Sequence, residues 1–239
     1  MIKNTDEILK KVKKIMAYND EELNNLSYES ALKLDKRNYC QYYISLLKTK
    51  HAIMLTFFNN TDYNSKIIKI VIFVLFFSLN LTINALFFND DTMHKIYEDE
   101  GNFNFIYQIP QIIYSTIISS LIQILIKYLS LTEKKILEIK NEKKNQNISK
   151  ILHNLVIKFI IFFVLVYIFL ILFWYYLSCF CAVYKNTQTH LIKDTLITFC
   201  LSLLYPFGLN LLPGVLRIIS LNNKKGEFLY NISKLIQLI

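Results

Sequence analysis

The chain has 239 residues, of which 54% are hydrophobic and 15% aromatic, with only four glycines and three prolines. A soluble globular domain of this length is less apolar and richer in turn residues, so the composition excludes an ordinary soluble domain. The formal net charge of +9 does not indicate nucleic-acid binding, because the sequence contains no nucleic-acid recognition motif.

The first 65 residues predict peripheral amphipathic helices rather than a membrane span. Between Asp35 and Phe58, apolar side chains recur at spacings of three and four, while Lys48 and Lys50 lie off that face. The face comprises Tyr39, Tyr43, Leu46, Leu47, Met54 and Phe58. This pattern favours a helix in the cytoplasmic interface, with its apolar face among acyl chains and its lysines at headgroups. A small soluble helical subdomain is the alternative, because both kinds of helix share the pattern.

Four long apolar blocks follow, and each is long enough to cross a membrane. A hydrocarbon core of roughly 30 Å requires about 20 apolar residues in a helix. Within hydrocarbon every backbone N–H and C=O must be paired internally, which makes such blocks helices. The predicted fold is an all-α integral membrane protein with cytoplasmic amphipathic helices, a transmembrane domain at 66–220 and a cytoplasmic tail at 221–239. Its four transmembrane helices are expected at about 67–88, 106–127, 159–183 and 195–216.

The distribution of basic residues predicts the orientation. Of the 27 Lys and Arg residues, 24 lie in the N-terminal region, the loop at 127–158 and the C-terminal tail. By the positive-inside rule, both termini are cytoplasmic, while the connections at 89–105 and 184–194 face the other side. The expected partners are therefore the bilayer itself and anionic lipids of the cytoplasmic leaflet.

The first non-cytoplasmic connection is acidic. It contains five carboxylates and a histidine, with Lys95 among them: Asp90, Asp91, His94, Glu98, Asp99 and Glu100. In a helix, Asp90, His94 and Glu98 share one face, and carboxylates with an imidazole suit zinc or another borderline cation. The same carboxylates are also typical of an acidic vestibule that concentrates cations above a pore. A solvated segment from which topology excludes basic residues is the third interpretation.

The second predicted span contains a polar stripe. Gln111, Ser115, Ser119 and Gln123 follow one another at steps of four, so they lie along one side of the helix. Asn80 and Asn84, one turn apart in the first span, are natural partners for it. Such a stripe indicates either helix–helix packing or a polar pathway through the bundle.

The fourth predicted span contains Pro206, Gly208, Pro213 and Gly214, which predict a break or kink. Transporters use broken helices as substrate sites, but kinked helices also occur in bundles without a transport function. The tail contains a further amphipathic stretch, which is expected to lie back on the membrane: Phe228, Ile232, Leu235, Ile236 and Ile239.

Four strings of the sequence resemble an uncharacterised C-terminal multi-pass membrane domain of large predicted membrane proteins of protists. They are ALKLDKRNYCQYYISLLKTKH, NALFFNDDTMHKIYEDEGNFNFIYQIPQIIYSTI, FWYYLSCFCAVYKNTQTHLIKDTLI and LLYPFGLNLLPG. The resemblance extends from about residue 20 to the C-terminus. It implies a membrane region that follows variable N-terminal sequence, and it implies no catalytic or binding residue.

The sequence contains no nucleophile elbow, P-loop or HExxH motif. An acid–base pair of His94 or His190 with Asp194 is an enzymatic alternative, but nothing in the sequence brings these residues together. We therefore expect a membrane anchor or assembly domain without catalytic activity or cofactor. The alternative is a cation channel or transporter subunit with a vestibule at 90–100 and a path along the polar stripe. That alternative requires a homo-oligomer, because four helices alone rarely enclose a pore.

Overall fold

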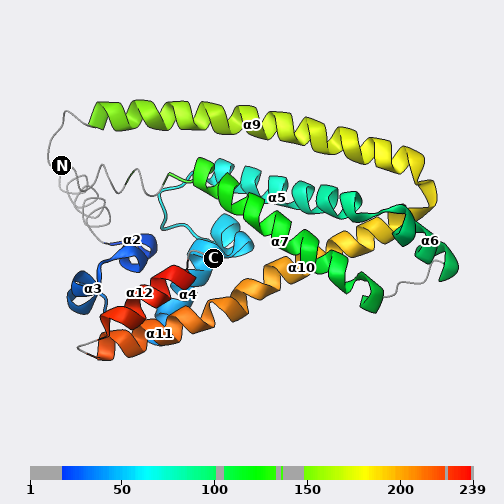
Figure 1. Cartoon of the computed structure of the whole chain (residues 1–239). Coiled ribbons are helices and arrows are strands. Elements are labelled where there is room, and N and C mark those ends of the chain that lie inside the picture. The colour runs from blue at the N-terminus through cyan, green and yellow to red at the C-terminus, as the bar shows by residue number, and fades with distance from the viewer. Residues whose placement is uncertain (1–17, 101–104, 133–135, 137–147, 224–225, 238–239) are drawn as a thin grey trace. The chain divides into compact units, whose positions relative to one another are not determined.

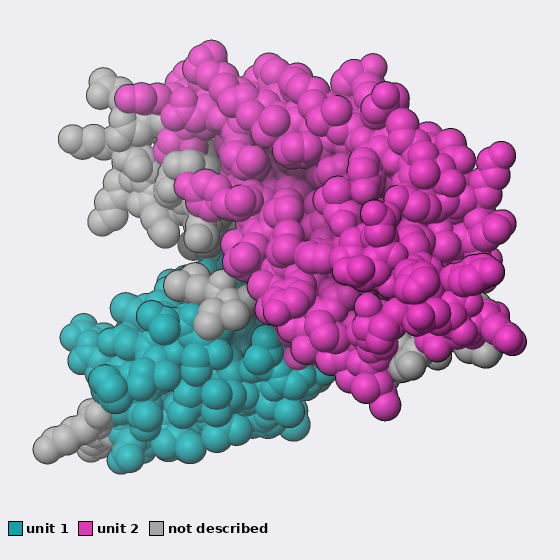
Figure 2. Space-filling view, turned by 45° about the vertical axis from the view of Figure 1, so that its right-hand side comes forward, with its two compact units in different colours: residues 1–62, 206–239 teal, residues 63–205 magenta. Residues whose placement is uncertain are grey.

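The structure is a computed structural model that describes residues 18–100, 105–132, 136, 148–223 and 226–237. It is helical, and no strand occurs within these ranges. The chain divides into two compact units, one of residues 63–205 and the other of residues 1–62 together with 206–239 (Figure 2). The sequence had predicted a different division, at residues 65 and 220.

The unit of residues 63–205 is a helical bundle (Figure 1). Its elements in chain order are α5 (Lys66–Phe87), α6 (Asp90–Glu98), α7 (Phe105–Ser130), α9 (Ile148–Val183), the short 3-10 helix η2 (Lys185–Thr187) and most of α10 (Gln188–Leu209).

Four helical runs among the described residues are long and apolar enough to cross a membrane, as predicted. They are Lys66–Phe87, Ile106–Ser130, Ile148–Val183 and Lys185–Asn222. The third run begins eleven residues before the predicted start at 159. The fourth extends beyond the predicted 195–216 at both ends, and it consists of more than one helix.

Helix α5 is the central helix of this unit. It packs against both α7 and α9. Within the protein, 56% of the most apolar stretch of α5 is buried, compared with 17% of the corresponding stretch of α9. One apolar cluster, which includes Ile72, Leu75 and Phe162, joins α5 to α7 and α9. A second cluster, which includes Ala85, Phe180 and Leu191, joins the end of α5 to the end of α9 and the start of α10. The exposed side of α9 is almost entirely apolar, as a lipid-facing surface requires.

The acidic connection between the first two spans is itself a helix, α6. Asn89 caps it, because its side-chain oxygen accepts a hydrogen bond from the backbone N–H of Thr92 at 2.8 Å. Asp90 and Asp91 occupy the first turn, where the positive end of the helix dipole favours carboxylates. The carboxylates therefore help to form the helix on which they lie.

The unit of residues 1–62 and 206–239 consists of short helices. They are α2 (Asp20–Asn25), α3 (Tyr28–Leu34), α4 (Tyr39–Lys50), the π-helix η1 (Met54–Phe58), α11 (Leu211–Asn222) and α12 (Glu227–Ile236). Capping boxes begin α2, with Asn19 and Glu22, and α4, with Asn38 and Gln41. Helix α11 packs on α3, α4 and α12, and this packing groups the two ends of the described chain.

The amphipathic helix predicted between Asp35 and Phe58 is divided in the structure. Helix α4 ends before His51, and η1 follows. The side chains of Tyr42 and Leu46 are fully buried, and α2 and α11 pack against α4. Protein therefore covers the inner face of α4, as in the subdomain alternative.

The tail stretch predicted to lie on the membrane is divided between two faces of α12. Tyr230 and Ser233 form its buried face, whereas Phe228 and Leu235 are exposed. Ile239 lies outside the described residues.

The fourth apolar run is interrupted at Asn210, between α10 and α11. Pro206 lies inside α10 and Pro213 lies in the first turn of α11, where a missing N–H is tolerated. Gly208 has open space around its Cα. Gly214 packs against Tyr39 of α4, since a Cβ added there would lie 2.9 Å from a ring carbon.

Candidate functional site

The acidic residues of α6 lie on the surface. Asp90, Asp91, His94, Glu98 and Glu100 are exposed, and Asp99 is half-buried. The helix does place His94 and Glu98 together, with Nε2 3.2 Å from Oε1. No group of three or more His, Cys, Asp or Glu side chains that could hold a metal ion occurs in the part of the chain that the structure describes. These residues therefore do not form a set of ligands for a metal ion, whereas the acidic vestibule stays a prediction.

The polar stripe of the second span faces the protein interior. Ser115 and Ser119 of α7 are fully buried, Gln123 is nearly so, and Gln111 is half-buried. The Ser115 hydroxyl donates to the Ile112 carbonyl at 3.1 Å, and the Ser119 hydroxyl donates to the Ser115 carbonyl. The hydroxyls thus satisfy themselves on their own helix, which leaves them as small groups that permit close packing of α7 on α5.

The two asparagines of the first span are also fully buried in α5. The Asn80 amide nitrogen donates to the Phe76 carbonyl within its own helix at 2.9 Å. The Asn84 oxygen accepts from the Thr198 hydroxyl at 3.5 Å. Asn84 therefore bonds to α10, and not, as predicted, to the stripe on α7.

A second polar face, on α10, was not recognised from the sequence. His190, Asp194, Thr198 and Ser202 follow one another at steps of four, and all four are buried. Thr195 lies beside Asp194 and is 1% exposed. The spacing is the same signal that identified the stripe on the second span. It was overlooked because the fourth span was expected to begin at 195, which placed His190 and Asp194 in a loop. In the structure α10 begins at Gln188, so both residues lie inside the helix.

Several polar atoms on this face and opposite it lack a hydrogen-bond partner among the described residues. They are both carboxylate oxygens of Asp194, Oγ1 of Thr195, Nδ1 of His190 and Nδ2 of Asn84. Asp194 is 0% exposed. Leu191, three residues before it, belongs to the apolar cluster of Ala85 and Phe180. A carboxylate in such surroundings is costly unless it is neutralised or hydrogen-bonded, so Asp194 is the candidate functional group of this unit.

The other unit contains a buried ionic cluster centred on Arg217 of α11. Arg217 is 0% exposed, and its Nη2 lies 2.8 Å from Oδ2 of Asp35. Arg37 binds the other carboxylate oxygen through Nε at 2.8 Å. The Arg217 guanidinium lies between the rings of Tyr42 and Tyr230, at 4.7 and 4.8 Å from their centroids.

Backbone carbonyls complete this cluster. Arg217 donates to the carbonyls of Leu23 at 2.7 Å and Asn24 at 3.3 Å, at the end of α2. Burial raises the pKa of Asp35, but hydrogen bonds and charges from Arg37 and Arg217 outweigh it and hold the pKa below its ordinary value of 3.8. The donors of Arg217 are thus committed to protein groups, and the cluster is a structural connection between α11 and the segment 23–37.

Comparisons with protein-family models, with curated proteins and with solved structures found no match to this chain. The resemblance to a protist membrane domain stays an expectation from the sequence.

Proposed function

We propose that the chain is a multi-pass membrane anchor or assembly domain without catalytic activity, with both termini in the cytoplasm. The observation that supports it best is the sidedness of the four candidate spans. Their polar side chains are turned into the protein, where the serines of α7 bond to their own helix, and their outer faces are apolar. This arrangement suits a bundle whose polar groups serve packing within a bilayer.

The unit of residues 1–62 and 206–239 fits a membrane-proximal position in this proposal. Three apolar residues of this unit are each more than 60% exposed: Phe58 of η1, and Phe228 and Leu235 of α12. Exposed aromatic and aliphatic groups beside lysines favour contact with the interface of an anionic leaflet. We therefore propose cytoplasmic-leaflet lipids as its partners.

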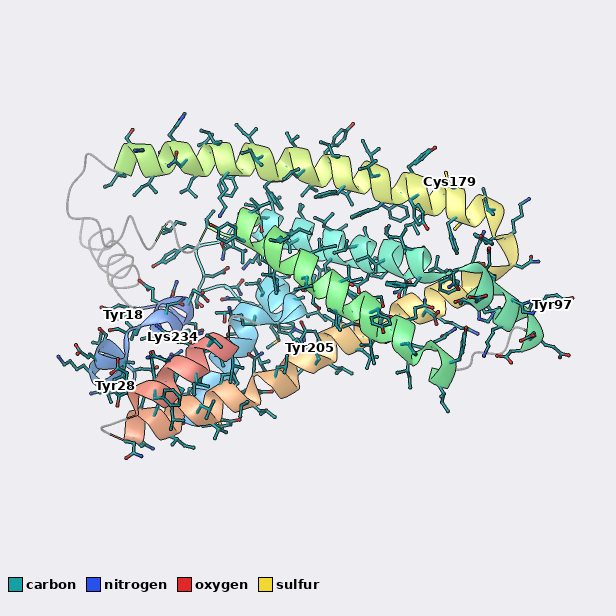
Figure 3. All side chains as sticks on the ribbon, viewed as in Figure 1. Tyr18, Tyr28, Tyr97, Cys179, Tyr205 and Lys234 are labelled. Carbon is teal, nitrogen blue, oxygen red and sulfur yellow. The ribbon has the colours of Figure 1, made fainter. Side chains whose placement is uncertain are left out.

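Cysteine labelling tests the membrane placement and the orientation together. Tyr97 of α6 projects away from the helices and is 83% exposed (Figure 3). In a variant that lacks the four native cysteines, Tyr97→Cys should react with an impermeant maleimide added to intact cells. The matched Asn60→Cys, also exposed, should react only after permeabilisation. Labelling of both sites in intact cells, or release of the chain by alkaline carbonate, would reject the proposal.

A cation channel or transporter subunit, acting as a homo-oligomer, is the second candidate. Some buried polar atoms of α5 and α10 have no hydrogen-bond partner among the described residues. They favour this candidate, because polar groups buried in a membrane bundle are typical of ion pathways. The test is the flux of a cation into liposomes that contain the chain. A flux that is lost when Asp90, Asp91 and Glu98 become Asn, Asn and Gln would establish this candidate and reject the anchor proposal. If the folded chain in liposomes carries no flux of any cation, the channel or transporter candidate is rejected.

A further inference from the structure

We propose that Asp194 and the oxygen atoms around it form a binding site for one monovalent alkali cation inside the bundle. The proposal goes beyond an anchoring function and does not depend on it. It rests on the complete burial of a carboxylate whose two oxygens have no hydrogen-bond partner among the described residues.

Two threonines of α10 supply further buried oxygen atoms, one next to Asp194 in the sequence and one on the same face of the helix. Thr195 is the adjacent residue, and its buried Oγ1 also lacks a partner within the described part of the chain. Thr198 lies one turn further along the same face, since side chains four residues apart stand about 5–6 Å from each other. The bond from Thr198 to Asn84 brings an amide of α5 to the same face. The oxygen atoms that would bind the cation therefore come from two helices, α10 and α5.

The chemistry of these donors selects a hard cation. A carboxylate, a threonine hydroxyl and an amide oxygen are ligands for alkali and alkaline-earth ions, whereas soft transition metals prefer thiolates and imidazoles. Bound water would complete the coordination shell.

The charge of the site selects a monovalent ion. Asp194 is the one carboxylate on the buried face of α10, so a single positive charge makes the site neutral. A divalent ion would leave a net positive charge in apolar surroundings, which is unfavourable. Lys193 is exposed, while Nδ1 of His190, one turn before Asp194, has no hydrogen-bond partner among the described residues.

The site lies near one end of the bundle. Asp194 is six residues from the start of α10, which corresponds to roughly 9 Å along the helix. Met93 and Ile96 of α6 pack in the same apolar cluster as Leu191 of α10, so α6 lies over this end. The exposed carboxylates of α6 raise the local concentration of cations there.

The test uses the full chain in nanodiscs, with thermal unfolding followed by the fluorescence of Trp174, the single tryptophan. At constant ionic strength, replacing choline chloride with NaCl or KCl should raise the midpoint in a saturable manner for at least one of the two ions. Asp194→Asn should remove this dependence, and Glu29→Gln, which alters an exposed carboxylate of α3, should keep it. Thr195→Val should weaken the apparent affinity about tenfold or more, as loss of a supporting group does in other metal sites.

Equal midpoints in choline, sodium and potassium would overturn the proposal, because Asp194 would then be protonated or hydrated. The proposal would also be overturned if the dependence of the midpoint on sodium or potassium survives in Asp194→Asn. Saturable stabilisation by Mg²⁺ or Ca²⁺ alone would overturn it as well. If Asp194→Asn fails to fold, binding of radioactive sodium or rubidium to the unaltered chain decides. Binding of about one ion per chain that is displaced by unlabelled sodium or potassium, but not by choline, would support the site. The absence of any bound ion would reject it. Carbonate extraction and maleimide labelling report on the anchor separately.

Discussion

At the scale of single residues, Arg217 shows how a fully buried charge is compensated by the groups around it. Its guanidinium is bound by Asp35 and two backbone carbonyls and is enclosed by the rings of Tyr42 and Tyr230. Arg37 shares the same carboxylate. Asp35 is the carboxylate paired with Arg217, whereas Arg37 also lies 3.7 Å from Oδ1 of Asp20. Removal of Asp35 therefore leaves the Arg217 charge buried beside a second guanidinium.

We expect Asp35→Ala to destabilise the unit of residues 1–62 and 206–239 by about 3–5 kcal/mol, because the fully buried Arg217 loses its carboxylate partner. Glu29→Ala, which alters an exposed carboxylate on α3, should change stability by less than about 0.5 kcal/mol. Tyrosine near-UV circular dichroism during urea denaturation gives both values. Equal effects of the two substitutions would contradict the buried cluster.

The same carboxylate predicts a dependence of stability on pH. The pKa of Asp35 lies below 3.8 in the folded state, so the folded state binds fewer protons than the unfolded state as pH falls. Its contribution to stability is therefore full above pH 3.8 and is lost as pH falls through the lower, folded value. The tyrosine signal should persist at pH 5 and weaken below pH 3.8. Asp35→Asn should remove this acid step, and a step near neutral pH would show that another group controls it.

At the scale of elements, the spans were predictable and their partners were not. Length and hydropathy are local properties, so α5, α7, α9 and the apolar run of α10 follow directly from sequence blocks. The contact of Arg217 with Asp35 joins residues 182 positions apart, and no local pattern reports it. Asp194 was misplaced for a related reason, because a charged residue was taken to mark the end of a span. In the structure Asp194 instead lies inside α10 and is fully buried.

The polar stripe of α7 makes a prediction about helix packing. Ser119→Leu adds a large side chain at a fully buried position between packed helices, and overpacking of this kind costs about 1–3 kcal/mol. Ser178→Leu makes the same change on α9, where Ser178 is exposed, and should be close to neutral in lipid. Unfolding by sodium dodecyl sulfate, followed by Trp174 fluorescence, compares them. If Ser178→Leu is the more damaging variant, the stripe does not face the bundle.

The two glycines near the helix break should respond in opposite directions to the same substitution. Gly208→Ala places its Cβ in open space and should stabilise α10 by about 0.5–1 kcal/mol. Gly214→Ala places its Cβ 2.9 Å from the Tyr39 ring, which is itself stacked on Tyr43, and should separate α11 from α4. Thermal unfolding followed by circular dichroism measures both. Equal stabilisation by the two substitutions would show that α11 does not pack closely there.

At the scale of the whole molecule, the chain forms two units that differ in kind. The unit of residues 63–205 is built from long apolar helices, whereas the other is held by capped short helices and a buried ionic cluster. The second unit draws on both ends of the described chain. Tyr28, for example, accepts from the Gly226 backbone and donates to the Asn223 carbonyl. Loss of either end should therefore unfold this unit while α5, α7 and α9 of the other unit stay intact.

A truncation after Asn223 tests this division. It removes α12 and the Tyr230 ring, which covers one face of Arg217 and bonds to the Leu26 carbonyl at 2.8 Å. We expect the truncated chain to resist carbonate extraction as the full chain does, because its four apolar runs are complete. The segment of residues 18–62 should become sensitive to trypsin, whose cleavage sites there include Lys33, Lys36 and Arg37. Tyr230→Ala should reproduce part of the sensitivity, and Phe228→Ala, on the exposed face of α12, should not. Unchanged protection of that segment in the truncated chain would mean that α11 alone holds it, and loss of carbonate resistance would mean that the spans depend on the second unit.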